Sequence, residues 1–339
     1  MLQRPFPGLR FTTKWSGTPV VVEEMLGEGA NGAVYRVRTP LGRAAMKVCT
    51  SSSDVAMEWS LLTSLGQGAK AFPKPMLIDD GPAEAPFFYV MEWIPGIPLN
   101  QAIEHRDFGT VIGAFEAIIL ALTDLHAAGY AFCDLKPENV MVVHEPGGVA
   151  IRFVDVGGVT QFGRSVRQYT PLCDRAFFGV GTRKAEPSYD VSALLLGLLC
   201  TFLPGHGADL AKLDPLRRLR TVQQSMQDFP VPGLPMLFEA LLQKRIVDAH
   251  DLWQAWNGLP ETARRVSVKP RGRKNTAKRV VHTKRPSTSG QRVQQRGQHV
   301  SGKPRTRKTD WTEWVMWVSL GSAGFVCVAA WAVVLGWLP

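Results

Sequence analysis

A short polar loop near the middle of the chain carries residue types that suit the transfer of a phosphoryl group. The stretch LHAAGYAFCDLKPENVMVV places Asp134, Lys136 and Asn139 between a predicted helix and an apolar strand. A carboxylate can accept the proton of a hydroxyl, a cation can stabilise the transferring group, and an amide oxygen can bind a metal. In IRFVDVGG, Asp155 leaves the next strand into glycines, where it could supply a second metal ligand. A turn at EPGG predicts a β-hairpin that joins the two loops.

A glycine-rich stretch, LGEGANGAVYRV, lies earlier in the chain between two segments of alternating apolar residues. We expect Gly27, Gly29 and Gly32 in the turn of a hairpin, where the absence of Cβ atoms lets backbone amides approach phosphate oxygens. An ordinary glycine-rich hairpin would fit the same pattern. The strand that follows the glycines argues against a dinucleotide fingerprint, which needs a helix at that point.

Lys47 lies inside the apolar strand AAMKV, where burial of its ammonium would cost free energy unless it faced an anion. The following segment, SDVAMEWSLLTSL, predicts a helix with Asp54 as its N-cap. Glu58 lies near the apolar face of this helix. By itself it reads as a solvated charge, but together with Lys47 it is a candidate for holding the ammonium toward phosphate.

The glycine loop, the lysine, the glutamate, DLKPEN and DVG occur in this order, and on these motifs residues 20 to 257 resemble the eukaryotic-like protein serine/threonine kinases. The resemblance implies an α+β, two-lobed protein kinase fold. A small antiparallel β lobe with one helix would cover residues 15–90, and a larger helical lobe would begin at residue 97. It also implies ATP and Mg²⁺ as cofactors, protein substrates with Ser or Thr, and a hinge at FYVMEWIPG.

The resemblance assigns roles to individual residues. It makes Asp134 the catalytic base, places Lys136 at the γ-phosphate and Lys47 at the α and β phosphates, and lets Glu58 orient Lys47. The expected metal ligands are Asn139 and Asp155. The expected nucleotide contacts are Gly27, Gly29, Gly32, Val34, Lys47, Glu92, Ile94 and Met141. Within the hinge, the backbone of Glu92 and Ile94 would bond adenine, Met91 would be the gatekeeper, and Met141 would lie beneath the ring.

Outside the nucleotide site, the resemblance predicts that buried Asp190 braces the catalytic loop with His126 as its partner, and that Glu186 pairs with Arg245. Several motifs depart from the family pattern. The arginine that usually precedes the base is Cys133, so no cation there would attract a phosphorylated activation loop. DFG has become DVG, and APE is scrambled to AEP. These changes keep open an alternative, a pseudokinase that serves as a nucleotide-binding scaffold.

The sequence also contains candidate sites of autophosphorylation and of substrate contact. We expect exposed hydroxyls for autophosphorylation at Thr160, Ser165, Thr170, Ser287, Thr288 and Ser289. Thr182, in GTRKAEP, is predicted to lie near the substrate-binding loop. The five cysteines, Cys49, Cys133, Cys173, Cys200 and Cys327, lie far apart and are typical of a reducing compartment.

The sequence predicts a kinase domain at residues 15–258. The net charge of +10 comes from the basic segment that follows this domain. Between Arg264 and Lys308 there are 16 Lys and Arg and no Asp or Glu. Few large apolar residues occur there, so residues 259–310 are predicted to be a disordered juxtamembrane linker. Residues 314–338 carry no charge over 25 positions, which predicts a transmembrane helix flanked by tryptophans.

These tail segments predict where the protein works. No signal peptide is visible at the N-terminus, and basic residues before the span predict a single-pass cell-membrane protein with a cytoplasmic kinase domain. The arrangement resembles that of many bacterial kinases of this kind. The linker could contact anionic lipid or nucleic acid, and the lipid is favoured because the segment lacks aromatic residues for base stacking. Small residues at 321–324 leave a homodimer as an open alternative.

Overall fold

The computed structural model describes residues 4–29, 31–66, 70–201 and 207–266. The chain divides into two units, Met1–Gly272 and Arg273–Pro339, and all the described residues belong to the first unit. The predicted transmembrane helix at 314–338 and nearly all of the predicted linker lie outside the described residues.

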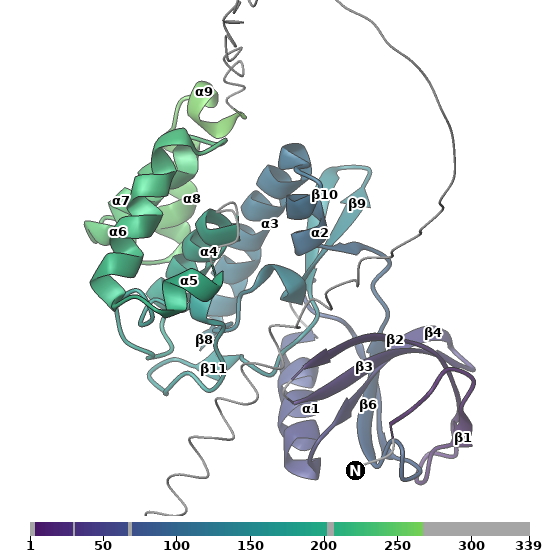
Figure 1. The fold of residues 1–339 in the computed structure, drawn as a ribbon. Helices are drawn as coiled ribbons and strands as arrows, with labels where there is room; N and C mark the ends of the chain where they lie inside the picture. The colour runs from purple at the N-terminus through teal and green to yellow at the C-terminus, as the bar shows by residue number, and fades with distance from the viewer. Residues whose placement is uncertain (1–3, 30, 67–69, 202–206, 267–339) are drawn as a thin grey trace, which may run out of the picture. The chain divides into compact units, whose positions relative to one another are not determined.

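The N-terminal part of the domain is built on a six-stranded antiparallel sheet with the order β1-β2-β3-β4-β6-β5 (Figure 1). Its strands are β1 (Arg10–Thr12), β2 (Pro19–Gly29), β3 (Gly32–Thr39), β4 (Gly42–Cys49), β5 (Pro75–Asp80) and β6 (Phe87–Glu92). Neighbouring side chains of β4 point to opposite faces, as the pleat requires. Met46 packs into an apolar cluster with Val37 and Phe88, whereas Ala45 belongs to the larger core that includes α1.

The helix α1 (Ser52–Gly66) packs against β4, β5 and β6. Val55, Leu62 and Leu65 are buried, and Glu58 is buried with them. The predicted cap at Asp54 is wrong, because the helix begins two residues earlier. The Ser51 hydroxyl oxygen accepts the Asp54 backbone N–H at 3.2 Å, and the same hydroxyl donates to the Asp54 carboxylate at 2.6 Å. Ser51 therefore caps the helix, and Asp54 supports that cap from the first turn.

The C-terminal part of the domain is mainly helical (Figure 1). Its helices are α2 (Leu99–Glu104), α3 (Phe108–Ala127), α4 (Pro187–Thr201), α5 (Gly207–Ala211), α6 (Pro215–Ser225), α7 (Gly233–Leu242), α8 (Ala249–Gly258) and α9 (Glu261–Arg264). Short strands accompany them: β7 (Ile97–Pro98) with β9 (Val140–Glu145) and β10 (Gly148–Phe153), and β8 (Tyr130–Ala131) with β11 (Thr160–Gln161). The predicted α+β fold with an antiparallel β lobe and a helical lobe is thus confirmed for the described residues.

The helix α3 forms the centre of the helical part. Among the described helices it is the one long and apolar enough to cross a membrane, and half of its apolar stretch is buried inside the domain. Its Phe115 ring contacts the buried ring of Trp256 in α8, with centroids 5.1 Å apart. The burial identifies α3 as a core helix of the domain.

The folded domain extends past its predicted end at residue 258. The helix α9 lies within the predicted linker, and its Ala263 is 7% exposed. A Cβ added to Gly233 in α7 would lie 2.9 Å from the Leu259 side chain and 3.0 Å from the Ala263 carbonyl oxygen. This close approach of α7 explains why the chain stays folded beyond residue 258.

Candidate active site

The loop between β8 and β9 brings Asp134 and Asn139 together. The Asn139 side-chain nitrogen donates to the Asp134 backbone oxygen at 3.0 Å and to Asp134 Oδ2 at 3.1 Å. Lys136 Nζ lies 3.4 Å from the same carboxylate oxygen. Because its nitrogen makes both bonds, Asn139 keeps its oxygen Oδ1 without a donor among the described residues. The three side chains predicted from DLKPEN therefore meet at one carboxylate.

Asp190 holds the backbone just before Asp134. Its carboxylate accepts the Phe132 N–H at 2.7 Å and the Cys133 N–H at 2.8 Å, and His126 Nε2 lies 3.0 Å away, as predicted. Cys133 has a φ of 65°, a left-handed conformation that is unfavourable for a residue with a Cβ. Strain of this kind costs on the order of 1 kcal/mol and persists only where surrounding contacts enforce it. Asp190, fully buried in α4, provides those contacts.

Lys47, Glu58 and Asp155 form a chain of charges between the sheet, α1 and the loop after β10. Lys47 Nζ lies 2.6 Å from Glu58 Oε2 and 2.9 Å from Asp155 Oδ1, and the Lys47 side chain is 4% exposed. The Tyr89 hydroxyl donates to Glu58 Oε2 at 2.9 Å. These contacts span 108 residues of sequence and join the two parts of the domain at one ammonium group.

Burial and charge act in opposite directions on these three groups. Burial disfavours the ammonium of Lys47, but the carboxylates of Asp155 and Glu58 outweigh it and raise the pKa of Lys47 above its usual value. Burial raises the pKa of Glu58 even though Lys47 opposes this effect. For Asp155, burial also acts to raise the pKa, but Lys47 and the Gly157 N–H lower it below the usual value. Lys47 and Asp155 are therefore held as an ion pair.

The hairpin of β9 and β10 connects Asn139 to Asp155. The strands pair from Val140 with Phe153 to Glu145 with Gly148, so the turn predicted at EPGG is confirmed. The Val154 N–H donates to the Asn139 backbone oxygen at 3.1 Å, which closes the open end of the hairpin. Asp155 Oδ1 also accepts the Gly157 N–H at 2.9 Å, and Asp155 Oδ2 has no donor among the described residues.

Two glycines allow close backbone approach at this site. A Cβ on Gly158 would lie 2.9 Å from the Phe132 carbonyl oxygen, so a larger residue would push the loop after Asp155 away from Asp134. Gly32 has a φ of 143°, and a Cβ there would lie 2.1 Å from the Val48 carbonyl oxygen. Gly29 and Gly32 pair with each other at the turn between β2 and β3, as predicted, whereas Gly27 lies within β2 and not in the turn. In this sheet Val34 pairs with both Gly27 and Lys47.

The predicted hinge follows β6. The Glu92 carboxylate accepts the Lys74 N–H at 3.1 Å and pairs with Arg152 on β10. Met91 is buried, and the Ile94 backbone N–H has no partner among the described residues. Met141 lies half-buried on β9, opposite Arg152 and Pro98. The hinge thus keeps a free backbone donor at Ile94.

Thr170 is a site residue whose position the sequence did not reveal. Its hydroxyl donates to Asp134 Oδ1 at 2.9 Å, whereas Thr182, predicted near the substrate-binding loop, contributes a backbone carbonyl to Arg175. The dipeptide Thr170–Pro171, which starts the short helix η2 (Pro171–Cys173), is the signal that could have drawn attention to it.

The expectation that Thr160 is exposed is wrong: it is 5% exposed and donates to the Gly158 carbonyl at 2.8 Å.

The predicted pairing of Glu186 with Arg245 is also wrong. Glu186 Oε1 lies 2.6 Å from Arg175, and Arg245 instead donates to the Gln243 side chain at 3.0 Å. Arg175 precedes Glu186 by eleven positions in the same loop, and Gly181 lies between them. Gly181 provides the space, because a Cβ there would lie 2.7 Å from the Arg175 side chain.

Comparison with known proteins places this geometry among protein kinases. No protein-family model matches the chain. Serine/threonine-protein kinase YabT of Bacillus subtilis is 31% identical over 312 residues, which cover 84% of this chain and 88% of YabT. Serine/threonine-protein kinase pkn3 of Myxococcus xanthus is 28% identical over 174 residues, covering 48% of this chain and 31% of pkn3.

A solved structure shares the fold. The structure of vaccinia related kinase 3 superposes with a TM-score of 0.53 at 15% sequence identity, covering 78% of this chain and 93% of that chain. At this identity the match shows a common fold alone. The match to YabT, by contrast, extends through most of both chains.

Proposed function

Because this chain belongs to the eukaryotic-like serine/threonine protein kinases, we propose that it transfers the γ-phosphoryl group of ATP through the site around Asp134, Lys47 and Asp155. The acceptor is a Ser or Thr hydroxyl of a protein. The observation that carries this proposal is the ammonium of Lys47, held by both Glu58 and Asp155. A lysine buried to this degree and oriented by two carboxylates is suited to bind phosphate oxygens.

The residues on the sheet side would bind the nucleotide. The turn flanked by Gly29 and Gly32 brings backbone amides toward the phosphates, and Lys47 contacts the α and β phosphates. At the hinge, the free N–H of Ile94 and the backbone of Glu92 bond adenine. Val34 above the ring and Met141 below it exclude water from the base.

The oxygen atoms of Asn139 and Asp155 suit a hard divalent cation such as Mg²⁺. Asn139 Oδ1 and Asp155 Oδ2 both lack a donor among the described residues, because the other polar atoms of these side chains make the internal bonds. When bound there, Mg²⁺ would neutralise charge on the phosphates. The proposal thus assigns the metal-binding role to two side-chain oxygens that accept no hydrogen bond from the part of the chain that the structure describes.

Asp134 would accept the proton of the substrate hydroxyl, and Lys136 would stabilise the phosphoryl group. Asn139 fixes the orientation of the Asp134 carboxylate through its side-chain nitrogen. Asp190 fixes the backbone behind it. Catalysis of this kind works mainly by positioning and by electrostatic stabilisation, so these rigid supports matter as much as the groups that touch substrate.

The test is transfer of label from [γ-³²P]ATP with Mg²⁺ by the purified full-length protein, beside the variants Asp134→Asn and Lys47→Met. Label on the protein or on a generic basic protein, absent with both variants, would support the proposal. The second candidate, a nucleotide-binding pseudokinase, is favoured by the AEP and DVG motifs. A wild-type protein that gains thermal stability with ATP and transfers no label would favour that candidate instead.

Autophosphorylation is a further part of the proposal. Of the three candidate hydroxyls in the described region, Ser165 is exposed, whereas Thr160 is buried and Thr170 is bonded to Asp134. We therefore place autophosphorylation at Ser165 and in the Ser/Thr-rich stretch 287–289. Mass spectrometry of the protein after incubation with MgATP, with Ser165→Ala as the control, tests this assignment.

Membrane attachment is proposed from the sequence of the tail. The uncharged residues 314–338 would span the bilayer, and the 16 basic residues before them would face anionic headgroups on the side of the kinase domain. Small residues at 321–324 would allow two such helices to pack as a homodimer. Flotation of the full-length protein with vesicles tests the span and the lipid contact of the linker. Binding that persists without anionic lipid but requires residues 311–339 would support the span and contradict the lipid contact of the linker.

A further inference from the structure

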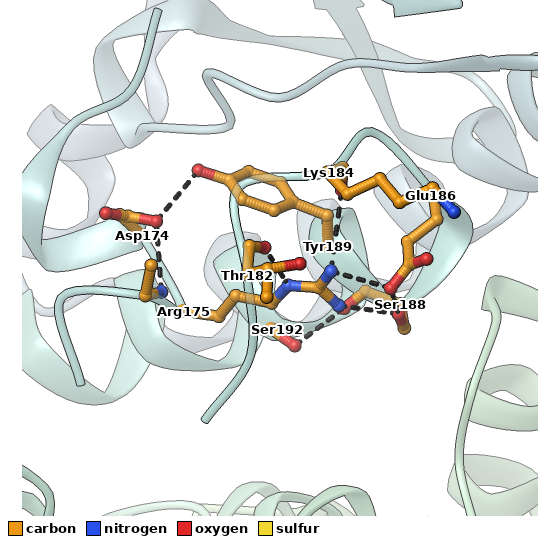
Figure 2. Close-up of polar contacts among 9 residues, drawn as sticks. Asp174, Arg175, Thr182, Lys184, Glu186, Ser188, Tyr189 and Ser192 are labelled. Atoms are coloured by element: carbon orange, nitrogen blue, oxygen red, sulfur yellow. Dashed lines mark hydrogen bonds and ion pairs between the residues drawn. The ribbon is translucent and has the colours of Figure 1, made fainter. Parts of the chain in front are cut away.

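Arg175 lies at the centre of a polar network with Thr182, Glu186 and Ser188 (Figure 2). It is 5% exposed, and each of its three nitrogens donates within the network. The Thr182 carbonyl and the Ser188 hydroxyl each accept at 2.7 Å, and the Glu186 carboxylate accepts at 2.6 Å. The guanidinium also lies 5.4 Å from the centroid of the Tyr189 ring. Arg175 thereby ties the beginning of the loop at residues 175–186 to its end.

The neighbouring residue, Asp174, closes a second set of contacts. Its carboxylate is fully buried and lies 2.8 Å from the Arg183 guanidinium. It also accepts the Tyr189 hydroxyl and the Ala176 N–H, each at 3.1 Å (Figure 2). Two consecutive residues of opposite charge are thus each paired within the segment itself. Since buried charges are stable only when paired and hydrogen-bonded, this arrangement strongly favours one loop conformation.

The network is connected to the catalytic loop through Tyr189. This side chain is buried in an apolar cluster with Ala131, Cys133, Val166 and Ala185. Backbone bonds join the same stretches, because the Val166 N–H donates to the Arg183 carbonyl at 2.9 Å and the Ala185 N–H donates to the Arg164 carbonyl at 2.8 Å. The two ends of the segment at residues 163–189 are therefore paired with each other. Thr170 lies between these ends and contacts Asp134.

The catalytic loop has no cation at position 133, where kinases of this family usually carry the arginine that binds a phosphate on this segment. Cys133 occupies that position and is 1% exposed. Lys136 is close to the Asp134 carboxylate, and Arg175 already donates from all three of its nitrogens. Ion pairs within the segment take the place of contacts to a phosphate: Asp174 pairs with Arg183, and Glu186 pairs with Arg175.

We propose that Asp174 and Arg175 hold the segment at residues 163–189 in its catalytic arrangement through internal ion pairs, so that phosphorylation of protein substrates requires no phosphate on this segment. Both are positioning residues: they act through Thr170 and the segment at residues 163–189, and neither is among the residues proposed to bind the nucleotide. The inference rests on the proposed phosphoryl transfer and adds to it a statement of how the active arrangement is reached.

One test separates substrate positioning from nucleotide binding in the full-length protein. Arg175→Met should lower kcat/KM for a protein substrate about tenfold or more, because it releases the loop that contacts substrate, while KM for ATP changes less than about twofold. Arg175→Lys should recover part of this loss. Arg220→Met, which removes an exposed arginine on α6, is the matched control and should behave as wild type.

The isosteric variant Glu186→Gln covers the case in which Arg175→Met does not fold. Glu186 is partly exposed, so this change removes one charge without leaving a cavity. It should lower kcat/KM for the protein substrate severalfold with KM for ATP unchanged. Wild-type values for both Glu186→Gln and Arg175→Met, or a loss confined to the KM for ATP, would overturn the proposal.

A second test addresses phosphate directly. The full-length protein is treated with a phosphatase, freed of it, and checked by mass spectrometry for the absence of phosphate on residues 158–190. Phosphoryl transfer to the protein substrate should then be linear from the first time point, at the rate of protein pre-incubated with MgATP. A lag that ends as phosphate appears on this segment would overturn the proposal. Wild-type protein inactive in both states would contradict the proposed function itself, and this inference with it.

Discussion

The hydroxyl of Thr170 donates to Oδ1 of Asp134 at 2.9 Å, on the carboxylate oxygen that Asn139 and Lys136 leave free. Each oxygen of the proposed base is thus oriented by a different part of the chain. Thr170 connects the proposed base to the segment at residues 163–189, so the position of that segment and the geometry of the base are linked.

The contact of Thr170 with Asp134 can be tested by replacing its hydroxyl. Thr170→Val keeps the shape of the side chain and removes the donor, and hydrogen bonds to charged groups contribute about 1.5–3 kcal/mol. We therefore expect kcat for a protein substrate to fall about tenfold or more with Thr170→Val and to stay near wild type with Thr170→Ser. Steady-state kinetics measure both. Equal rates for Thr170→Val and Thr170→Ser would show that the hydroxyl has no role.

Glu58 should be needed for ATP use, because it holds Lys47 from inside the protein. Glu58→Gln removes the charge and leaves Lys47 paired with Asp155 alone. We expect kcat/KM for ATP to fall about tenfold or more. Tyr89→Phe deletes the hydroxyl that bonds Glu58 but keeps the ion pair, so the decrease there should be below about threefold. If Tyr89→Phe were as inactive as Glu58→Gln, the hydroxyl rather than the ion pair would be the main support.

Asp79 should make stability depend on pH at the acidic end. Burial acts to raise the pKa of Asp79, but the backbone N–H groups of Ser16 and Trp15 outweigh it and lower this pKa to about 2. Because the pKa is lower in the folded state than in the unfolded state, the stabilisation is present above pH 4 and is lost as the pH falls toward 2.

The matching experiment compares wild type with Asp79→Asn by urea unfolding. At pH 7 the variant should lose on the order of 1 kcal/mol of unfolding free energy, after allowance for solvent screening. At pH 3 the two proteins should differ by less, since the Asp79 carboxyl of the unfolded wild-type chain already binds a proton at this pH while that of the folded protein stays mostly ionised. A difference that is the same at both pH values would contradict the assignment to Asp79.

Cys133 should not tolerate the arginine that kinases of this family usually have at this position. The side chain is 1% exposed and packs with Ala131, Val166, Ala185 and Tyr189. The neighbouring Asp190 carboxylate is already occupied, because it accepts the Phe132 and Cys133 N–H groups. A guanidinium buried here could bond Asp190 only by displacing these backbone donors, so it should cost about 3 kcal/mol or more of unfolding free energy, whereas Cys133→Ser should cost less. Urea unfolding measures both. A stable Cys133→Arg protein that became dependent on phosphate would contradict this prediction and the proposed ion-pair support of the segment.

The helix α9 should contribute to the stability of the domain. Leu259 is half-buried and Ala263 is buried against α7. A chain that ends at residue 258 should therefore be less stable than one that ends at residue 266, by about 2 kcal/mol from the apolar area that becomes exposed. Thermal unfolding of the two truncated proteins tests this. Equal melting temperatures of the two truncated proteins would show that the folded domain ends at residue 258.

The sequence by itself determined the local parts of this protein. The residues of DLKPEN, the hairpin at EPGG and the glycine turn each lie within a short stretch, and the residue types there dictate the backbone that forms. The order of the motifs was enough to predict the α+β fold and to place Lys47 and Asp155 in one site, although 108 residues separate them.

Tertiary structure alone decided which partners the remaining charges take. Thr170 reaches Asp134, and Glu186 takes Arg175 rather than Arg245, because the segment at residues 163–189 folds back on itself and is paired at its ends. Spacing along the chain carries no information about such contacts. Several acceptors are available to any arginine in the unfolded chain, and burial selects among them, since a charge removed from water must find its partner within the few ångströms that packing allows.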